Sequence, residues 1–147
     1  MGNEKELLCF SANDVTYAVE MEAVVEIYSS ISVWQIPCLP DVFRGIYNYK
    51  GEFISILSLE KDRREESDGP GETGRQIVIL VNSGEYLFGI QTESELWMCK
   101  VKEEDAAEVS EVRQEDCWCE KQIYKVDLEI VHLLDLKLSA REVAKLV

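Results

Sequence analysis

The stretch from Gly45 to Leu59 constrains the fold most, because its pattern is that of two β-strands joined by a tight turn. Tyr, Ile and Phe recur on both sides of the pair Lys50-Gly51, and these residue types fit a pleated, half-buried surface. Gly51 can take a positive φ without steric cost, which suits the residue that closes a hairpin with a bulge. The stretch therefore predicts a hairpin with Lys50 at or near its tip.

Short β-rich runs of the same kind recur along the whole chain, separated by turn-forming residues. They predict about nine strands, at residues 7–10, 15–19, 45–49, 53–59, 75–81, 86–90, 95–101, 122–126 and 128–134. Many short strands without a long helix indicate a small all-β barrel or sandwich.

Helices take up little of the sequence. Apolar residues at positions 21, 24, 25 and 28 have the spacing of one helix face, so residues 20–28 predict a short amphipathic helix, although the same run allows a strand. Residues 41–44 suggest a single helical turn before Gly45. A C-terminal helix is expected to begin near Ser139, whose hydroxyl caps it, with Glu142 completing a capping box.

Charge and composition exclude several classes of function. The chain has 147 residues, 46% of them hydrophobic, which is enough for one domain with a sizeable core. It carries 29 acidic and 15 basic residues, a net charge of −14, and this surface repels nucleic acids and anionic membranes. Without an apolar signal core or a run near the ~20 residues of a membrane span, we expect a cytoplasmic protein with no direct membrane insertion.

Two further features follow from composition. Residues 60–74 are acidic, lack large apolar side chains and contain a Gly-Pro-Gly run, so they predict a mobile acidic loop within the domain. The five cysteines are odd in number and scattered, at positions 9, 38, 99, 117 and 119, which indicates reduced thiols that are mostly core residues.

Signals for catalysis are weak. The chain has one histidine, His132, which lies in an apolar run where a structural role is more common. Cys117 and Cys119 with that histidine do not supply the four spaced ligands of a structural zinc site, so we predict no metal, no cofactor and no catalytic residue. A small β-barrel that binds a ligand or metal through these three side chains remains the alternative. Six aromatic residues are more than one small core needs, so we expect most of them in the core and a minority at an interface. They are Tyr28, Trp34, Tyr47, Tyr49, Trp97 and Trp118.

The order of these motifs resembles the CheW-like domain, the coupling adaptor family of bacterial chemotaxis. The central match is Gly-Ile-Tyr-Asn-Tyr-Lys-Gly at residues 45–51, which is similar to the family's Gly-Val-Ile-Asn-Leu-Arg-Gly and is followed by hydrophobic residues. Around it, in the family's order, lie an opening hairpin with Phe10 and Tyr17 and segments at residues 24–27, 36–40, 75–81, 89–93 and 134–136. Each motif is weak alone, but their order and spacing cover about residues 6–147.

The resemblance implies a mainly β fold of two small SH3-like five-stranded β-barrels packed around a shared core, with short helices including a C-terminal one. It implies that residues 1–147 form a single CheW-like domain without catalytic activity. It further implies an adaptor that couples the cytoplasmic tip of chemoreceptors to the regulatory domain of a CheA-type histidine kinase. A coupling module of a two-component pathway outside chemotaxis is the alternative.

The resemblance also implies where a partner binds. The family's arginine in the central motif falls at Lys50, and its glutamate before the helix isoleucine falls at Glu26; in relatives the two lie near the receptor-facing region and can pair. Asn48 and Gly51 complete the expected partner-binding set. Lys50 has a compact ammonium at the position where the family's arginine has a planar guanidinium with five hydrogen-bond donors. This departure marks a divergent member of the family.

Overall fold

Two β-sheets and one C-terminal α-helix make up the part of the chain that the computed structural model describes, which comprises residues 4–29, 31–37, 39–60, 76–107, 114–115 and 117–146. The strands are β1 (Glu4–Ala12), β2 (Val15–Glu20), β3 (Val24–Ser29), β4 (Phe43–Tyr49), β5 (Glu52–Leu57), β6 (Ile77–Asn82), β7 (Leu87–Thr92), β8 (Trp97–Lys102), β9 (Gln114–Glu115), β10 (Trp118–Val126) and β11 (Glu129–Leu134). Two 3-10 turns, η1 (Met21–Ala23) and η2 (Glu103–Asp105), and helix α1 (Leu136–Ala144) complete the described elements.

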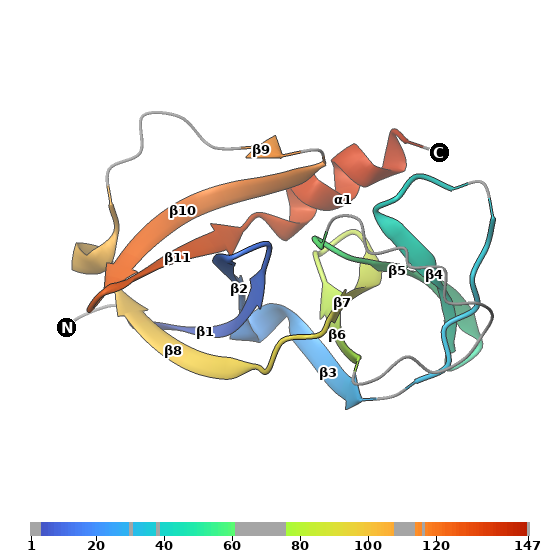
Figure 1. Ribbon diagram of the computed structural model, residues 1–147, viewed down its shortest axis with the longest axis horizontal. Coiled ribbons are helices and arrows are strands. Elements are labelled where there is room, and N and C mark those ends of the chain that lie inside the picture. Colours follow the sequence, from blue (N-terminus) through green and yellow to red (C-terminus); the bar gives the residue numbers. More distant parts are fainter. Residues whose placement is uncertain are drawn as a thin grey trace.

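Each sheet forms a small barrel, and the two barrels repeat one pairing pattern. Barrel 1 has the order β8-β1-β2-β11-β10, extended by the two-residue β9, and barrel 2 has the order β3-β6-β7-β5-β4. In both, two antiparallel pairs are followed by one parallel pair (β2 with β11, β7 with β5) and a further antiparallel pair. Barrel 2 is built from consecutive strands and is inserted between β2 and β8 of barrel 1 (Figure 1).

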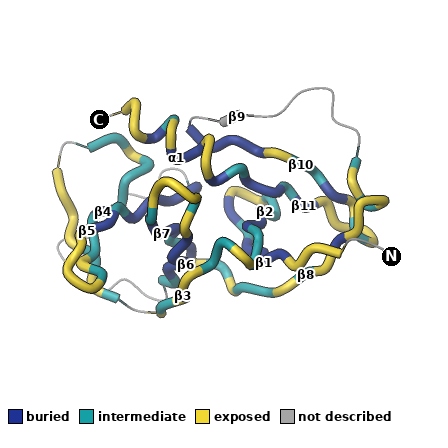
Figure 2. The backbone as a smooth tube through the Cα atoms, turned by 180° about the vertical axis from the view of Figure 1, so that it is seen from behind, coloured by how far each residue is buried: buried dark blue, intermediate teal, exposed yellow. Residues whose placement is uncertain are grey.

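Strand alternation divides the apolar residues among three clusters. Successive side chains of a strand point to opposite faces, so a strand between two cores serves both. In β1, Leu7 and Cys9 face the interior of barrel 1, whereas Leu8 and Phe10 face a large cluster between the barrels. The same division holds in β6, whose residues 78 and 80 line the interior of barrel 2 while residues 79 and 81 face that large cluster. We call the cluster between the barrels the shared core; Figure 2 shows the chain buried there and exposed at the loops.

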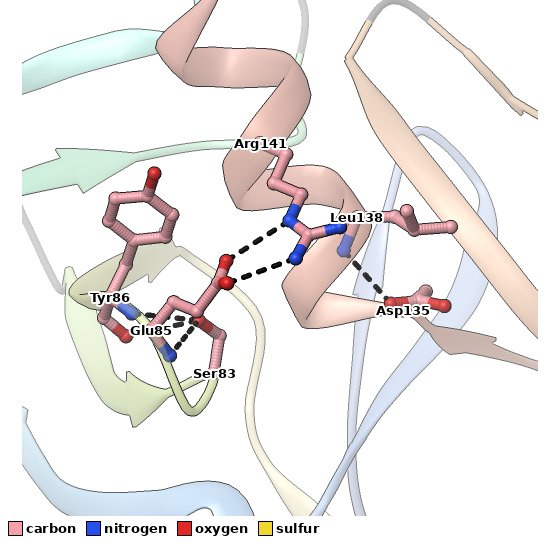
Figure 3. Close-up of polar contacts among 6 residues, drawn as sticks. All are labelled: Ser83, Glu85, Tyr86, Asp135, Leu138 and Arg141. Carbon is pink, nitrogen blue, oxygen red and sulfur yellow. Dashed lines mark hydrogen bonds and ion pairs between the residues drawn. The ribbon is translucent and has the colours of Figure 1, made fainter.

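Helix α1 belongs to the shared core and ties the barrels together. Leu136, Ala140 and Val143 recur at the spacing of one helix face, and all three are buried in the shared core. On the outer side, the Arg141 guanidinium donates two hydrogen bonds, of 3.0 and 2.9 Å, to the Glu85 carboxylate in the β6–β7 turn (Figure 3). The helix that follows barrel 1 is therefore fixed to barrel 2 by both apolar packing and an ion pair.

The predicted helix at residues 20–28 is wrong. Only Met21–Ala23 form a 3-10 turn, and Val24–Ser29 form strand β3, antiparallel to β6. Half-buried and exposed residues alternate along β3 with a period of two, which is the pattern of a strand. Its β-branched residues favour this pairing over a helix. The single helical turn expected at residues 41–44 is also absent, because β4 begins at Phe43.

The C-terminal helix begins one turn earlier than predicted. Its N-cap is Asp135, whose Oδ1 accepts a hydrogen bond of 3.0 Å from the Leu138 amide (Figure 3). Ser139, the predicted cap, lies inside the helix, where its hydroxyl accepts a hydrogen bond of 2.9 Å from the Cys119 amide. It therefore joins α1 to β10 instead of starting the helix. Residues 61–74 of the expected mobile loop lie outside the described residues.

Candidate functional site

The tip of the β4–β5 hairpin is a two-residue turn made by Lys50 and Gly51. Tyr49 pairs with Glu52, and the two residues between them have φ values of 51° and 90°. Positive φ at both central positions matches the right-handed twist of the flanking strands, and glycine takes it without strain. The bulge predicted at the tip lies instead at the other end of β4, between Phe43 and Gly45.

Asn48 fixes the shape of this turn. Its Oδ1 accepts a hydrogen bond of 2.9 Å from the Gly51 amide. Asn48, Lys50 and Gly51 are all exposed, and the structure thus brings three of the four predicted partner-binding residues together at one tip. That these residues bind a partner stays a prediction.

Three tyrosines of barrel 2 lie near the predicted residues: Tyr28 is two residues from Glu26 in β3, and Tyr47 and Tyr49 precede Lys50 in β4. The rings of Tyr28 in β3 and Tyr47 in β4 have centroids 5.7 Å apart, and the Lys50 Nζ lies 5.2 Å from the centroid of the Tyr49 ring. All three rings are partly buried against the interior of barrel 2. This tyrosine cluster (Tyr28, Tyr47 and Tyr49) connects β3 to β4, the two end strands of the sheet order, and so closes the barrel.

Glu26 engages the tyrosine cluster. The pKa of the Tyr28 hydroxyl is raised above its ordinary value, chiefly by a hydrogen bond with the Glu26 carboxylate and then by burial. Between the described residues there is no ion pair that joins Glu26 to Lys50. The two opposite charges that the resemblance pairs thus form no ion pair in the described part of this chain.

An exposed aromatic surface on barrel 2 contains Trp34, which is among the aromatic residues considered for an interface from the sequence, and Phe53, which is not. Trp34 is 70% exposed and Phe53 is 67% exposed. Trp34 exchanges two backbone hydrogen bonds of 2.9 Å with Ile46, and Asn48 pairs with Phe53. Side chains of directly paired residues, and of residues two apart in a strand, share one face of a sheet. Trp34, Ile46 and Phe53 therefore form one aromatic patch on the outer face of the β4–β5 hairpin.

The sequence pattern indicates the outward position of Phe53 in this patch but not the position of Trp34. Ile54 and Ile56 are buried inside barrel 2, so alternation places Phe53 on the outer face. Trp34 lies in a segment that pairs with β4 only through a single bridge, and no periodic pattern in the sequence marks that pairing.

His132 and the nearby cysteines have structural surroundings. The His132 Nδ1 lies 2.9 Å from Glu120 Oε1, and its ring lies 6.0 Å from that of Tyr17. Cys117 and Cys119 are buried. Throughout the described ranges, no group of three or more His, Cys, Asp or Glu side chains is arranged to hold a metal ion. The alternative of a metal site at these side chains thus finds no ligand set in that part of the chain.

No disulfide joins any of the described cysteines, and burial governs the acidity of three of their thiols. It raises the pKa of Cys9 to about 12 and also raises the pKa values of Cys99 and Cys119. Since the thiolate is the nucleophilic form, such thiols are poor nucleophiles near neutral pH. In the described ranges, no helix is long and apolar enough to cross a membrane.

The described chain is thus a two-barrel β protein that exposes a charged hairpin tip and an aromatic patch. The chain belongs to the CheW-like domain family, whose sequence model matches residues 6–143.

Relatives with a known role support the same family. The chain is 28% identical over 102 residues to the chemotaxis protein CheW of Treponema pallidum, which covers 68% of this chain and 60% of that protein. It is 27% identical over 86 residues to the chemotaxis protein CheW of Klebsiella aerogenes, covering 58% of this chain and 51% of that protein. The matches thus span only half to three fifths of the relatives' own lengths.

A solved structure establishes the fold. The scaffolding protein TtCheW from Thermoanaerobacter tengcongensis superposes with a TM-score of 0.71 at 19% identity, over 90% of this chain and 89% of that one. The predicted fold of two small SH3-like barrels around a shared core is therefore confirmed.

Proposed function

We propose that this chain is a non-enzymatic cytoplasmic adaptor that couples chemoreceptors to a CheA-type histidine kinase. The observation that carries the proposal is a pair of chemically different surfaces on one rigid hairpin of a CheW-like fold. One is the charged tip beside the tyrosine cluster, and the other is the aromatic patch on the outer face. The two surfaces adjoin at the Asn48–Phe53 pair, and neighbouring surfaces of different chemistry on one hairpin suit a protein that holds two partners in a fixed relation.

We assign the tip to the receptor. The set is Lys50, Asn48 and Gly51 at the turn and Glu26 across the tyrosine cluster. An exposed ammonium contributes little to folding stability but steers and orients a partner. The Asn48–Gly51 hydrogen bond fixes the backbone of the turn that carries Lys50. This preorganisation lowers the cost of ordering on binding.

We assign the aromatic patch to the regulatory domain of the kinase. Large apolar side chains that are this exposed are uncommon on a protein without a partner, and aromatic residues are enriched at the centres of interfaces. Trp34 and Phe53 are held in place by strand pairing, so they present a fixed surface.

The test is co-elution of the purified chain with each partner separately, at tens of micromolar, followed by titration. We expect Lys50→Glu to weaken binding of a receptor-tip fragment about tenfold, because an exposed pair is lost and a like-charge repulsion is gained, each about 0.7 kcal/mol. Binding of the kinase domain should change little. The double variant Trp34→Ser, Phe53→Ser should show the opposite preference. The melting temperature should hardly change in Lys50→Glu.

Lys125→Glu is the matched control, since Lys125 is an equally exposed lysine on barrel 1 with the same charge change. It should leave binding of both partners unaltered. If the unmodified protein co-elutes with neither partner, the proposed coupling is wrong. Equal effects of Lys50→Glu and Lys125→Glu would show that only net charge matters and that the hairpin tip is no docking point.

A further inference from the structure

Lys50 has a backbone conformation that a lysine rarely adopts. Its φ is 51°, in the left-handed region, where Asn and Asp are enriched and other residues with a Cβ are strained. Among the described residues, the other non-glycine residues with a positive φ are Asn13, Asp14 and Asp127. Lysine is thus the exception at this kind of position in the chain. Strain that is retained at an exposed turn points to a function for the residue that bears it.

The β10–β11 hairpin of barrel 1 is an internal reference for this turn. Its closing pair, Val126 with Glu129, encloses a two-residue turn, just as the closing pair of the β4–β5 hairpin does. Both hairpins also have a register shift toward the start of their first strand. The first turn residue of the β10–β11 hairpin is Asp127, with a φ of 56°. The same turn therefore forms with a residue type that suits it, and turn geometry alone does not require the lysine at position 50.

The ring of Tyr49 holds the side chain of this lysine. The Lys50 Nζ lies 5.2 Å from the centroid of the Tyr49 ring, within the range of a cation–π interaction. The ring itself packs against the interior of barrel 2, which restricts its position. Lys50 is exposed, and within the described ranges no ion pair includes it. An ammonium has three donors, so the solvent side of this group remains free for an acceptor.

We propose that Tyr49 is a positioning residue of the hairpin site: its ring holds the Lys50 ammonium at the tip, where the ammonium binds a carboxylate of the docked receptor. The inference rests on the proposed function and names the chemistry of the receptor at this point. In a chain with a net charge of −14, a cation held on an exposed turn is a feature that a partner's carboxylate can recognise. Asn and Asp suit the turn better, but neither has an ammonium.

The first test uses the protein alone and follows the protons on the ε-carbon of Lys50 by NMR. An aromatic ring shifts the resonances of protons above its face upfield. We expect Tyr49→Leu to move these resonances to the values of a solvated lysine, whereas Tyr49→Phe, which keeps the ring, should leave them shifted. The resonances of Lys125, an exposed lysine on barrel 1, are the control and should not move. Lys50 resonances that do not respond to Tyr49→Leu overturn the inference.

The second test measures the affinity for a soluble fragment that carries a chemoreceptor's cytoplasmic tip. We expect Tyr49→Leu to weaken binding roughly threefold, because the ammonium is then held in place for a smaller fraction of the time. Tyr49→Phe should bind like the unmodified protein. Tyr86→Leu is the matched control, the same change at an exposed tyrosine of the β6–β7 turn, and it should leave the affinity unaltered.

A double variant separates positioning of the ammonium from a merely structural role of the ring. In Lys50→Gln no ammonium remains to be held, so adding Tyr49→Leu should cause no further loss of affinity. Lys50→Asn should also weaken binding without lowering the melting temperature, because Asn suits the left-handed conformation. A further loss in the double variant would show that the ring acts on the partner or the fold directly, and it overturns the inference.

Two other outcomes also decide the matter. Tighter binding by Lys50→Glu would show that the receptor presents a cation at this point, and it overturns the inference. If the unmodified protein does not bind the fragment, the proposed function fails together with the partner carboxylate. The Lys50 resonances in the protein alone then still decide whether Tyr49 holds the ammonium.

Discussion

Gly45 is the position at which a single added methyl group should damage barrel 2 most. Its φ of 149° is a conformation that residues with a Cβ rarely adopt. A Cβ there would overlap the Trp34 carbonyl oxygen and approach Val33 Cγ1 to 2.6 Å. Since the carbonyl is backbone, Gly45→Ala must push the segment of residues 33–34 away from β4.

The magnitude follows from what that displacement breaks. Strain at a left-handed position costs roughly 1–2 kcal/mol for a residue with a Cβ. The two hydrogen bonds between Trp34 and Ile46, each 2.9 Å long, contribute about 1 kcal/mol apiece. Gly45→Ala should therefore lower the free energy of unfolding by about 3–4 kcal/mol, a large share of the ~5–15 kcal/mol of a typical domain. The melting temperature should fall by roughly 10 °C.

Gly51→Ala is the matched control, because Gly51 also has a positive φ but a Cβ there would meet no atom within 4 Å. Gly51→Ala should lower the free energy of unfolding by the backbone strain alone, about 1–2 kcal/mol. Urea denaturation gives both free energies, and hydrogen exchange of the Ile46 amide reports whether its bond to the Trp34 carbonyl is lost. Equal losses in the two variants, with the Ile46 amide still protected in Gly45→Ala, would refute the role of the close approach.

Three further predictions concern the shared core and helix α1. Phe10→Ala should cost about 3–5 kcal/mol in urea denaturation, since Phe10 is fully buried between the barrels, and a loss below ~1 kcal/mol would contradict that packing. Asp135→Ala should cost about 1 kcal/mol by the same measurement, because the cap to the Leu138 amide is lost; an unchanged value would show that the cap is dispensable. Arg141→Gln should lower the melting temperature near neutral pH. The Arg141 hydrogen bonds lower the pKa of Glu85, so their stabilisation is present above the ordinary carboxyl pKa and is lost as pH falls through the lowered value. A difference between the two proteins that persists undiminished at a pH of about 2 would contradict this linkage.

Local patterns in the sequence predicted the individual strands well, because period-two alternation and turn residues are local signals. The β4–β5 hairpin and Lys50 at its tip came directly from them. The error at residues 20–28 has a physical cause. Apolar spacing there fits a helix, but the partner that decides for a strand is β6, about fifty residues later in the chain.

The site was only partly predictable for a similar reason. The turn residues Asn48, Lys50 and Gly51 are neighbours in the sequence, so their meeting follows from the hairpin itself. Glu26 lies in β3, and the Tyr28–Tyr47 contact that brings β3 to β4 joins the two end strands of the sheet order. The resemblance to the CheW-like domain supplied the two-barrel fold, which strand patterns alone left as a barrel or sandwich.

The insertion of barrel 2 between β2 and β8 imposes an order on folding. Barrel 2 is complete once residues 24–92 have left the ribosome, and its strands are consecutive in the chain. Strands β1 and β2 form a complete barrel 1 only with β8, β10 and β11, the first of which begins at Trp97. Closing so long a loop is entropically costly. During synthesis, barrel 2 can therefore be the first unit to cover the apolar side chains of β1 and β2 that face the shared core. Barrel 2, which carries the hairpin site, thus also provides the folded surface against which barrel 1 closes.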